Sequence, residues 1–195
     1  MKKFELTSEF VTFLGKKLFR IKALISFGNV KEGELGGFVE KEENLDQSGN
    51  AWVYGNAWVY GDAWVFGNAW VYGDARVYGD ARVSGNARVY GNAKVFGNAR
   101  VSGNAWVSGN AWVSGNAKVF GNDDYATVHG FGSEYRTTTF FRTKAGEIGV
   151  RCGCFYGTLE EFRAKIKETH GETKTAKEYL MVADLMEFRF SKEEA

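Results

Sequence analysis

Between residues 49 and 120 the apolar and polar positions follow one six-residue pattern, repeated twelve times without interruption. Each unit reads Gly, then Asn or Asp, then Ala, then Trp, Arg or Lys, then Val, and finally Tyr, Phe or Ser. Ala and Val lie two positions apart, so in an extended strand both side chains point to the same face. Gly followed by Asn or Asp favours a tight corner. Each unit therefore predicts one short strand and one turn, with Ala and Val facing inward.

A strand that buries only Ala and Val cannot fold alone, but stacked strands of this kind form a continuous thin core. Residues 27–39 resemble the segment that precedes the coils in an acyltransferase-like subset of bacterial and phage-borne β-helix proteins, and the repeat itself resembles the hexapeptide-repeat left-handed parallel β-helix. That resemblance covers 72 of the 195 residues. It implies a triangular solenoid with three units in each coil, and the left-handed winding comes from the resemblance alone. Residues 43–48 look like a degenerate unit with Leu45 at the Ala site, which predicts about four to five coils in total.

The two ends of such a solenoid need caps, because they would otherwise expose unpaired strand edges and an open core. Residues 1–28 alternate in a strand-like way around Gly15, so they predict an N-terminal β-hairpin cap. Beyond the repeat, residues 135–143 and 148–152 predict a second hairpin. Thr158 with Glu161 matches a helix capping box, and Gly171 is a plausible end for that helix.

A second helix is predicted over residues 175–187, and residues 188–190 are expected to add a short strand to the sheet. The predicted fold is therefore mainly β: a left-handed parallel β-helix with an N-terminal hairpin cap and a small C-terminal α+β module. We expect three segments, namely a cap (1–36), the repeat β-helix (37–122) and the C-terminal module (123–195).

All six tryptophans occupy the outward position between Ala and Val. With three units in each coil, residues 18 apart stack and form three ladders, which read Trp52, Trp70, Arg88, Trp106, then Trp58, Arg76, Lys94, Trp112, then Trp64, Arg82, Arg100, Lys118. Stacked aromatic and cationic side chains can simply stabilise neighbouring strands. Yet so much outward Trp, Tyr and Arg is also typical of an interface.

We therefore expect the ladders to mediate self-association or to bind a partner. The residues expected at this interface are Trp52, Trp58, Trp64, Trp70, Trp106, Trp112, Tyr54, Tyr60, Tyr72, Tyr78, Arg76, Arg82, Arg88 and Arg100. The third ladder stacks like charges about 4.8 Å apart, and the neighbouring Asp62 and Asp80 are expected to balance them.

The sequence contains few residues that could serve catalysis or bind a metal. The acyltransferases that the repeat resembles use a histidine base, but residues 49–120 contain no histidine, so His129 is the candidate base if the chain is an enzyme. The resemblance also implies a second class, the γ-type carbonic anhydrase, which needs three histidine ligands, whereas this chain has two histidines. Cys152, Cys154 and His170 could hold a metal, although buried cysteines more often serve only packing.

Charge, apolar run length and cysteine count each bear on the possible partners and location of the protein. The chain carries 25 basic and 24 acidic residues, so its overall charge does not indicate nucleic-acid binding. No apolar run approaches the ~20 residues that span a bilayer, and two cysteines do not suggest a disulfide framework. These features predict a cytoplasmic protein that binds neither membranes nor a cofactor.

The leading hypothesis is a non-catalytic β-solenoid scaffold that self-associates through its ladders and binds a partner protein through its C-terminal module. Antagonism of a host factor by a phage-encoded protein is an open variant of this hypothesis. Two alternatives remain: an acyltransferase-like enzyme that uses His129, and a protein that sequesters a nucleotide or glycan in grooves between subunits.

Overall fold

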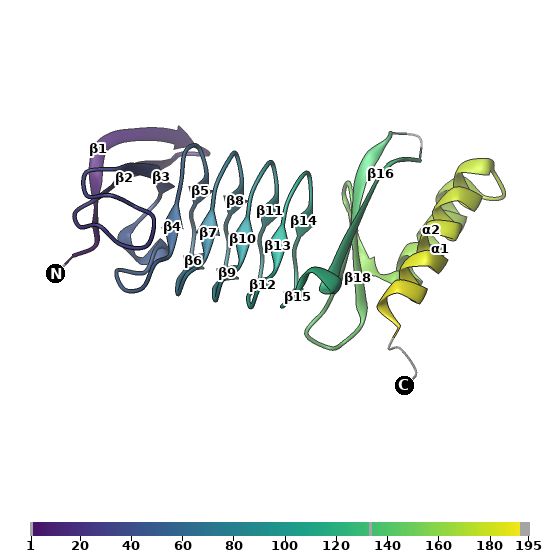
Figure 1. The fold of residues 1–195 in the computed structure, drawn as a ribbon. Helices are drawn as coiled ribbons and strands as arrows, with labels where there is room; N and C mark the ends of the chain where they lie inside the picture. The colour runs from purple at the N-terminus through teal and green to yellow at the C-terminus, as the bar shows by residue number, and fades with distance from the viewer. Residues whose placement is uncertain (1, 133, 192–195) are drawn as a thin grey trace.

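A computed structural model describes residues 2–132 and 134–191, and the chain forms an elongated solenoid with a different cap at each end (Figure 1). The N-terminal cap contains β1 (Phe4–Phe13), β2 (Lys16–Ala23) and β3 (Leu35–Val39). The solenoid contains twelve two-residue strands, which are β4 (Trp52–Val53), β5 (Trp58–Val59), β6 (Trp64–Val65), β7 (Trp70–Val71), β8 (Arg76–Val77), β9 (Arg82–Val83), β10 (Arg88–Val89), β11 (Lys94–Val95), β12 (Arg100–Val101), β13 (Trp106–Val107), β14 (Trp112–Val113) and β15 (Lys118–Val119).

The C-terminal module follows in chain order. It contains β16 (Tyr125–Phe131), β17 (Arg136–Arg142), β18 (Ile148–Cys152), β19 (Phe155–Thr158), α1 (Leu159–His170) and α2 (Lys174–Phe190). Two single-turn 3-10 helices flank the solenoid, at Glu42–Asn44 and Asn122–Asp124.

The twelve short strands form three faces, and the solenoid strands within each face are parallel. This arrangement confirms the predicted solenoid. The first face continues from the N-terminal hairpin through β5, β8, β11 and β14, the second contains β4, β7, β10 and β13, and the third contains β6, β9, β12 and β15. Strands pair with a spacing of one coil, so Trp52 lies opposite Trp70 and Val53 opposite Val71. The repeated Ala and Val side chains are buried throughout and form one continuous core.

The coil that precedes residue 49 has a different register from the one we predicted. Leu45 bridges Val65 and Val39 pairs with Val59, so each is displaced by 20 residues, since 65 − 45 = 20 and 59 − 39 = 20. Leu45 therefore extends the Val row of the core, and its predicted place at the Ala site is wrong. The two extra residues lie after Leu45, because Leu45 and Val53 are eight residues apart whereas successive Val residues of the repeat are six apart.

The corners of the solenoid require glycine. Gly85 has φ +65°, and a Cβ placed on it would lie 2.9 Å from the backbone nitrogen of Gly103 in the next coil. Two constraints thus act at one position, namely a left-handed backbone and the close approach of the next coil. The invariant Gly of the repeat has a steric cause.

At the N-terminal end, polar side chains cap carbonyl groups that have no preceding coil to pair with. The ammonium group of Lys3, a residue that is 2% exposed, donates to the carbonyls of Ser48 at 3.1 Å and Ala51 at 3.0 Å. On the third face, the Asn44 amide donates to the carbonyls of Gly61 at 2.9 Å and Ala63 at 2.8 Å. Both caps are hydrogen-bond donors.

At the C-terminal end the caps are acceptors. The backbone N–H of Trp106 donates to Asn122 Oδ1 at 2.8 Å, that of Trp112 to Thr139 Oγ1 at 3.0 Å, and that of Phe120 to Asp124 Oδ2 at 2.8 Å. These are the groups that would pair with a following coil. The two ends of the solenoid are therefore terminated by side chains of opposite hydrogen-bonding character.

The Lys3 cap predicts an unusual pH response. Burial lowers the pKa of Lys3 from 10.5 to about 8, against the opposing charge of Asp46. Between these pH values the unfolded lysine keeps its proton and the folded one releases it, so the free energy of unfolding should rise from pH 8 to 10. Urea denaturation of a Lys3→Met variant should lack this rise. A Lys2→Met variant, which changes an exposed side chain, should retain it; identical pH profiles for all three proteins would contradict the assignment.

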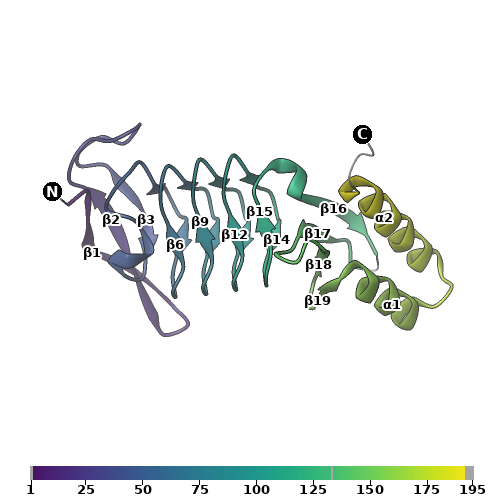
Figure 2. The ribbon, with the colours of Figure 1, turned by 90° about the horizontal axis from the view of Figure 1, so that it is seen from below.

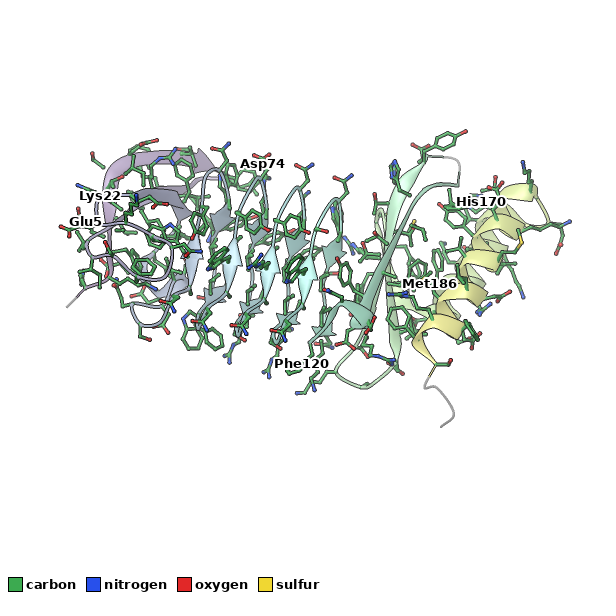
Figure 3. All side chains as sticks on the ribbon, in the orientation of Figure 1. Glu5, Lys22, Asp74, Phe120, His170 and Met186 are labelled. Carbon is green, nitrogen blue, oxygen red and sulfur yellow. The ribbon has the colours of Figure 1, made fainter. Side chains whose placement is uncertain are left out.

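The C-terminal sheet lies between the last coil and the helices (Figures 1 and 2). Its strand order is β16-β17-β18-β19, and all neighbours are antiparallel. In β17, Phe141 joins the solenoid core, whereas Phe140 joins the core beneath α1 and α2. Met186 of α2 faces the same helix–sheet core (Figure 3).

The predicted hairpin over residues 135–152 and the capping box at Thr158 and Glu161 are confirmed. Residues 188–190, however, do not form a strand; they are the last turn of α2. Phe190 is buried there, and its carbonyl accepts a hydrogen bond of 2.8 Å from Arg142. Strands β16 and β19 were not predicted.

Candidate functional site

The outward ladders form the stacks that the 18-residue spacing predicts. Tyr60, Tyr78 and Phe96 lie face to face, with centroid separations of 5.0 and 4.9 Å and ring planes parallel to within 2°. Burial, with a contribution from Tyr78, raises the pKa of Tyr60 to about 12. On the second face, the guanidinium of Arg88 lies 4.9 Å from the Trp70 ring and 4.8 Å from the Trp106 ring. Much of the aromatic surface is thus used within the chain.

The six tryptophans have different surroundings. Trp52 is fully buried, because Phe27 and Phe4 of the N-terminal segment cover it with ring centroids at 5.3 and 6.2 Å. Its expected place in an external interface is therefore wrong. Trp58 packs against Phe13 at 5.1 Å. Trp64 and Trp106 are the most exposed of the six tryptophans, at 37% and 45%.

The remaining residues of the expected interface also differ in their exposure to solvent. Tyr54, Tyr60, Tyr72, Tyr78, Trp70, Trp112, Arg76 and Arg88 are half-buried, whereas Arg82 and Arg100 are exposed. Arg76 stacks 4.2 Å from the Trp58 ring.

The basic ladder on the third face consists of Arg82, Arg100 and Lys118 and lacks the expected counter-ion. Asp62 is bound instead by Lys41 at 2.8 Å. Within residues 2–132 and 134–191, neither Asp62 nor Asp80 forms an ion pair with the ladder. The stacked cations therefore face solvent.

The structure separates the candidate metal ligands. Cys152 ends β18 and accepts a hydrogen bond of 3.2 Å from Thr138, whereas Cys154 is exposed in the following turn. His170 stacks on the ring of Tyr179 at 5.9 Å, and the Tyr179 hydroxyl lies 3.9 Å from Cys152. No three His, Cys, Asp or Glu side chains in the described part of the chain are grouped as metal ligands.

A pocket of about 390 Å³ lies where the first solenoid face meets the C-terminal sheet. This junction pocket is lined by Asn92, Lys94, Asn110, Trp112, His129, Arg136, Thr137, Arg151 and Gly153. The ring of His129 contacts Thr137 Oγ1 at 3.1 Å. His129 thus lines a pocket and contacts a hydroxyl, and no carboxylate is among the lining residues.

A second surface feature could not be recognised as exposed from sequence. Met181, Leu185 and Phe188 lie on one side of α2 at helical spacing, and they are 62%, 56% and 79% exposed. We call this row the α2 stripe. The sequence predicted a helix over residues 175–187 and placed Phe188 in a strand. The opposite face of α2 supplies the core, through Tyr179, Val182, Ala183 and Met186.

Charged groups surround the α2 stripe unevenly. Arg163 of α1 binds both Asp184 and Glu187, the latter at 2.6 Å. Lys177 and Arg189, near the two ends of the stripe, are exposed. Asp184 and Glu187 are thus engaged by Arg163, and basic side chains lie near both ends of the stripe, with Arg189 3.9 Å from Asp123.

Comparison with known families supports the solenoid. A family model described as YdcK Beta solenoid repeat matches residues 69–85, 75–91, 81–95, 93–109 and 99–115. These overlapping matches lie inside the regular coils and cover well under half of the chain. A comparison with curated proteins found no match.

The chain contains a β-solenoid repeat scaffold, and the match does not extend to the acyltransferase-like subset. No helix among the described residues is both long and apolar enough to cross a membrane.

Proposed function

We propose that the protein is a non-catalytic scaffold that binds a partner protein through the α2 stripe. The observation that carries the proposal is the exposure of Met181, Leu185 and Phe188 on a helix whose other face is already packed. Contiguous exposed apolar side chains on a helix are typical of helix-in-groove or helix-to-helix recognition. The solenoid acts as a rigid spacer between this surface and the N-terminal cap.

The charges around the stripe define the kind of partner. Lys177 and Arg189 flank the apolar row, Arg189 with a long contact of 3.9 Å to Asp123, whereas Asp184 and Glu187 are held by Arg163. A partner helix with an apolar stripe and acidic flanks complements this surface. A second copy of α2 fits less well, because its own acidic groups beside the stripe are already engaged. Binding of this kind is also compatible with antagonism of a host factor.

Replacing Met181, Leu185 and Phe188 together by glutamine should abolish partner capture without changing the fold, since all three side chains face solvent. The matched control is Phe120→Gln, which removes a 63% exposed phenylalanine from the solenoid end (Figure 3). Pull-downs from a bacterial lysate would be compared for wild type and both variants. An acidic amphipathic peptide from the captured protein should then bind wild type at least tenfold more tightly than the triple variant. Equal capture by all three proteins would refute the proposal.

Self-association is a second candidate, favoured by the exposure of Trp64 and Trp106. Trp64 lies on the third solenoid face and Trp106 on the second. We expect sedimentation at tens of micromolar to detect oligomers of the wild type and fewer oligomers of a Trp64→Ser, Trp106→Ser variant. A strict monomer at these concentrations would remove self-association and leave the α2 proposal standing.

A further inference from the structure

The junction pocket concentrates positive charge without a matching negative charge. Lys94 comes from the solenoid, Arg136 from β17 and Arg151 from β18, and no Asp or Glu is among the lining residues. In the described part of the chain, the one acidic partner of these three cations is Glu134, which lies 3.5 Å from Arg136. Like charges held together in this way favour an anion between them.

Two of the three cations are fixed by aromatic rings. The Lys94 ammonium lies 4.4 Å from the Trp112 ring, and the Arg151 guanidinium lies 5.7 Å from Trp112 and 5.6 Å from Phe96. Ring faces position a cation without neutralising its charge. The Nε of Arg151 is, moreover, buried without a hydrogen-bond partner within the described residues. This N–H group can therefore donate to an anion that enters the pocket.

The charged form of Lys94 is destabilised by its surroundings. Burial lowers its pKa, and the charge of Arg76 in the preceding coil lowers it further. The titratable and charged groups that face Lys94 are therefore Arg76, Arg151, Arg136 and His129, none of which is acidic. An anion would remove this repulsion.

We propose that the junction pocket binds the phosphate group of a small molecule, held by Lys94, Arg136 and Arg151. Arginine forks and a lysine are the side chains that most often bind phosphate oxygens in proteins. The volume of about 390 Å³ is sufficient for a phosphate ester of nucleotide size. Asn92 and Asn110, at equivalent corners of successive coils, add amide groups that suit polar parts of such a ligand. This site is distinct from the α2 stripe.

Isothermal titration calorimetry with three probes tests this proposal on the full-length protein. Inorganic phosphate, adenosine monophosphate and citrate would be titrated at fixed ionic strength. We expect the phosphate probes to bind and citrate to bind at least tenfold more weakly. Stronger binding of adenosine monophosphate than of phosphate identifies an organic phosphate as the ligand, whereas equal binding identifies the free ion. Absence of phosphate binding at millimolar concentration, or equal binding of citrate, would overturn the proposal.

Matched variants locate the site. Lys94→Gln should weaken phosphate binding at least tenfold, whereas Arg100→Gln, at the same repeat position on the third face, should leave it unchanged. Arg136→Gln is the second variant, and it should also weaken phosphate binding. Because the Arg136 side chain is 55% exposed, this change should not disturb the fold, so the test stays decisive if Lys94→Gln does not fold. Equal weakening by Arg100→Gln would show that binding follows overall charge. Because α2 is unchanged in every variant, these results do not depend on partner capture.

Discussion

Replacing Trp52 by alanine should lower the free energy of unfolding by about 3–5 kcal/mol, which is the usual cost of truncating a buried tryptophan. The side chain is fully buried against Phe4 and Phe27, and so its removal leaves a cavity between the cap and the first coil. Urea denaturation followed by far-UV circular dichroism measures the loss. We expect the N-terminal cap to detach from the solenoid at lower urea concentration than in the wild type.

Trp64→Ala is the matched control, because Trp64 occupies the same position in its repeat but is 37% exposed. Its loss should be smaller, about 1–2 kcal/mol, consistent with partial burial and one stacked neighbour, Phe66. Trp52→Phe should cost less than Trp52→Ala, since the indole Nε1 of Trp52 is buried without an acceptor in the described part of the chain. Equal losses for Trp52→Ala and Trp64→Ala would show that the cap contributes little.

The contrast between these tryptophans marks the limit of the sequence analysis. Their local sequences are nearly identical, Gly-Asn-Ala-Trp-Val-Tyr and Gly-Asp-Ala-Trp-Val-Phe. Periodicity therefore predicted their strand, their outward position and their stacking partners correctly. It could not predict burial, because Phe4 and Phe27 reach Trp52 from the non-repeating N-terminal segment.

The same limit applies to the candidate site. His129 was recognised as the histidine nearest the repeat, but Lys94, Arg136 and Arg151 come from elements whose relative placement only the tertiary structure defines. The exposure of the α2 stripe could not be predicted for a different reason. Tyr179 and Met181 are both apolar in the sequence, and only the packing of α2 on the sheet separates a buried face from an exposed one.

The caps also depend on distant contacts. The side chain of Asn44 is fully buried and uses its whole amide group: Nδ2 donates to the carbonyls of Gly61 and Ala63, and Oδ1 accepts from the backbone N–H of Lys41 at 3.0 Å. One side chain thus replaces the backbone of an absent strand. The three bonds explain why a polar residue lies at the end of an otherwise apolar core.

Asn44→Asp, which keeps the shape and removes the two N–H donors, should therefore lower the free energy of unfolding by about 3–5 kcal/mol at pH 7. A carboxylate oxygen would then face the carbonyl oxygens of Gly61 and Ala63, and burial would raise the pKa of the new carboxyl. Protonation of the new carboxyl returns one donor. Because its pKa is raised in the folded state, the folded protein binds this proton more readily than the unfolded protein. The loss in free energy of unfolding should therefore become smaller as the pH falls from 7 towards 4.5.

Urea denaturation of wild type and Asn44→Asp at pH 7 and pH 4.5 measures both effects. The matched control is Asn56→Asp, at an exposed corner position where the repeat itself carries aspartate at residues 62, 74 and 80. That change should alter the free energy of unfolding by less than about 0.5 kcal/mol. If Asn44→Asp unfolded at the same urea concentration as Asn56→Asp, the carbonyl ends of the third face would not need a side-chain donor, and the cap would owe its stability to apolar packing alone.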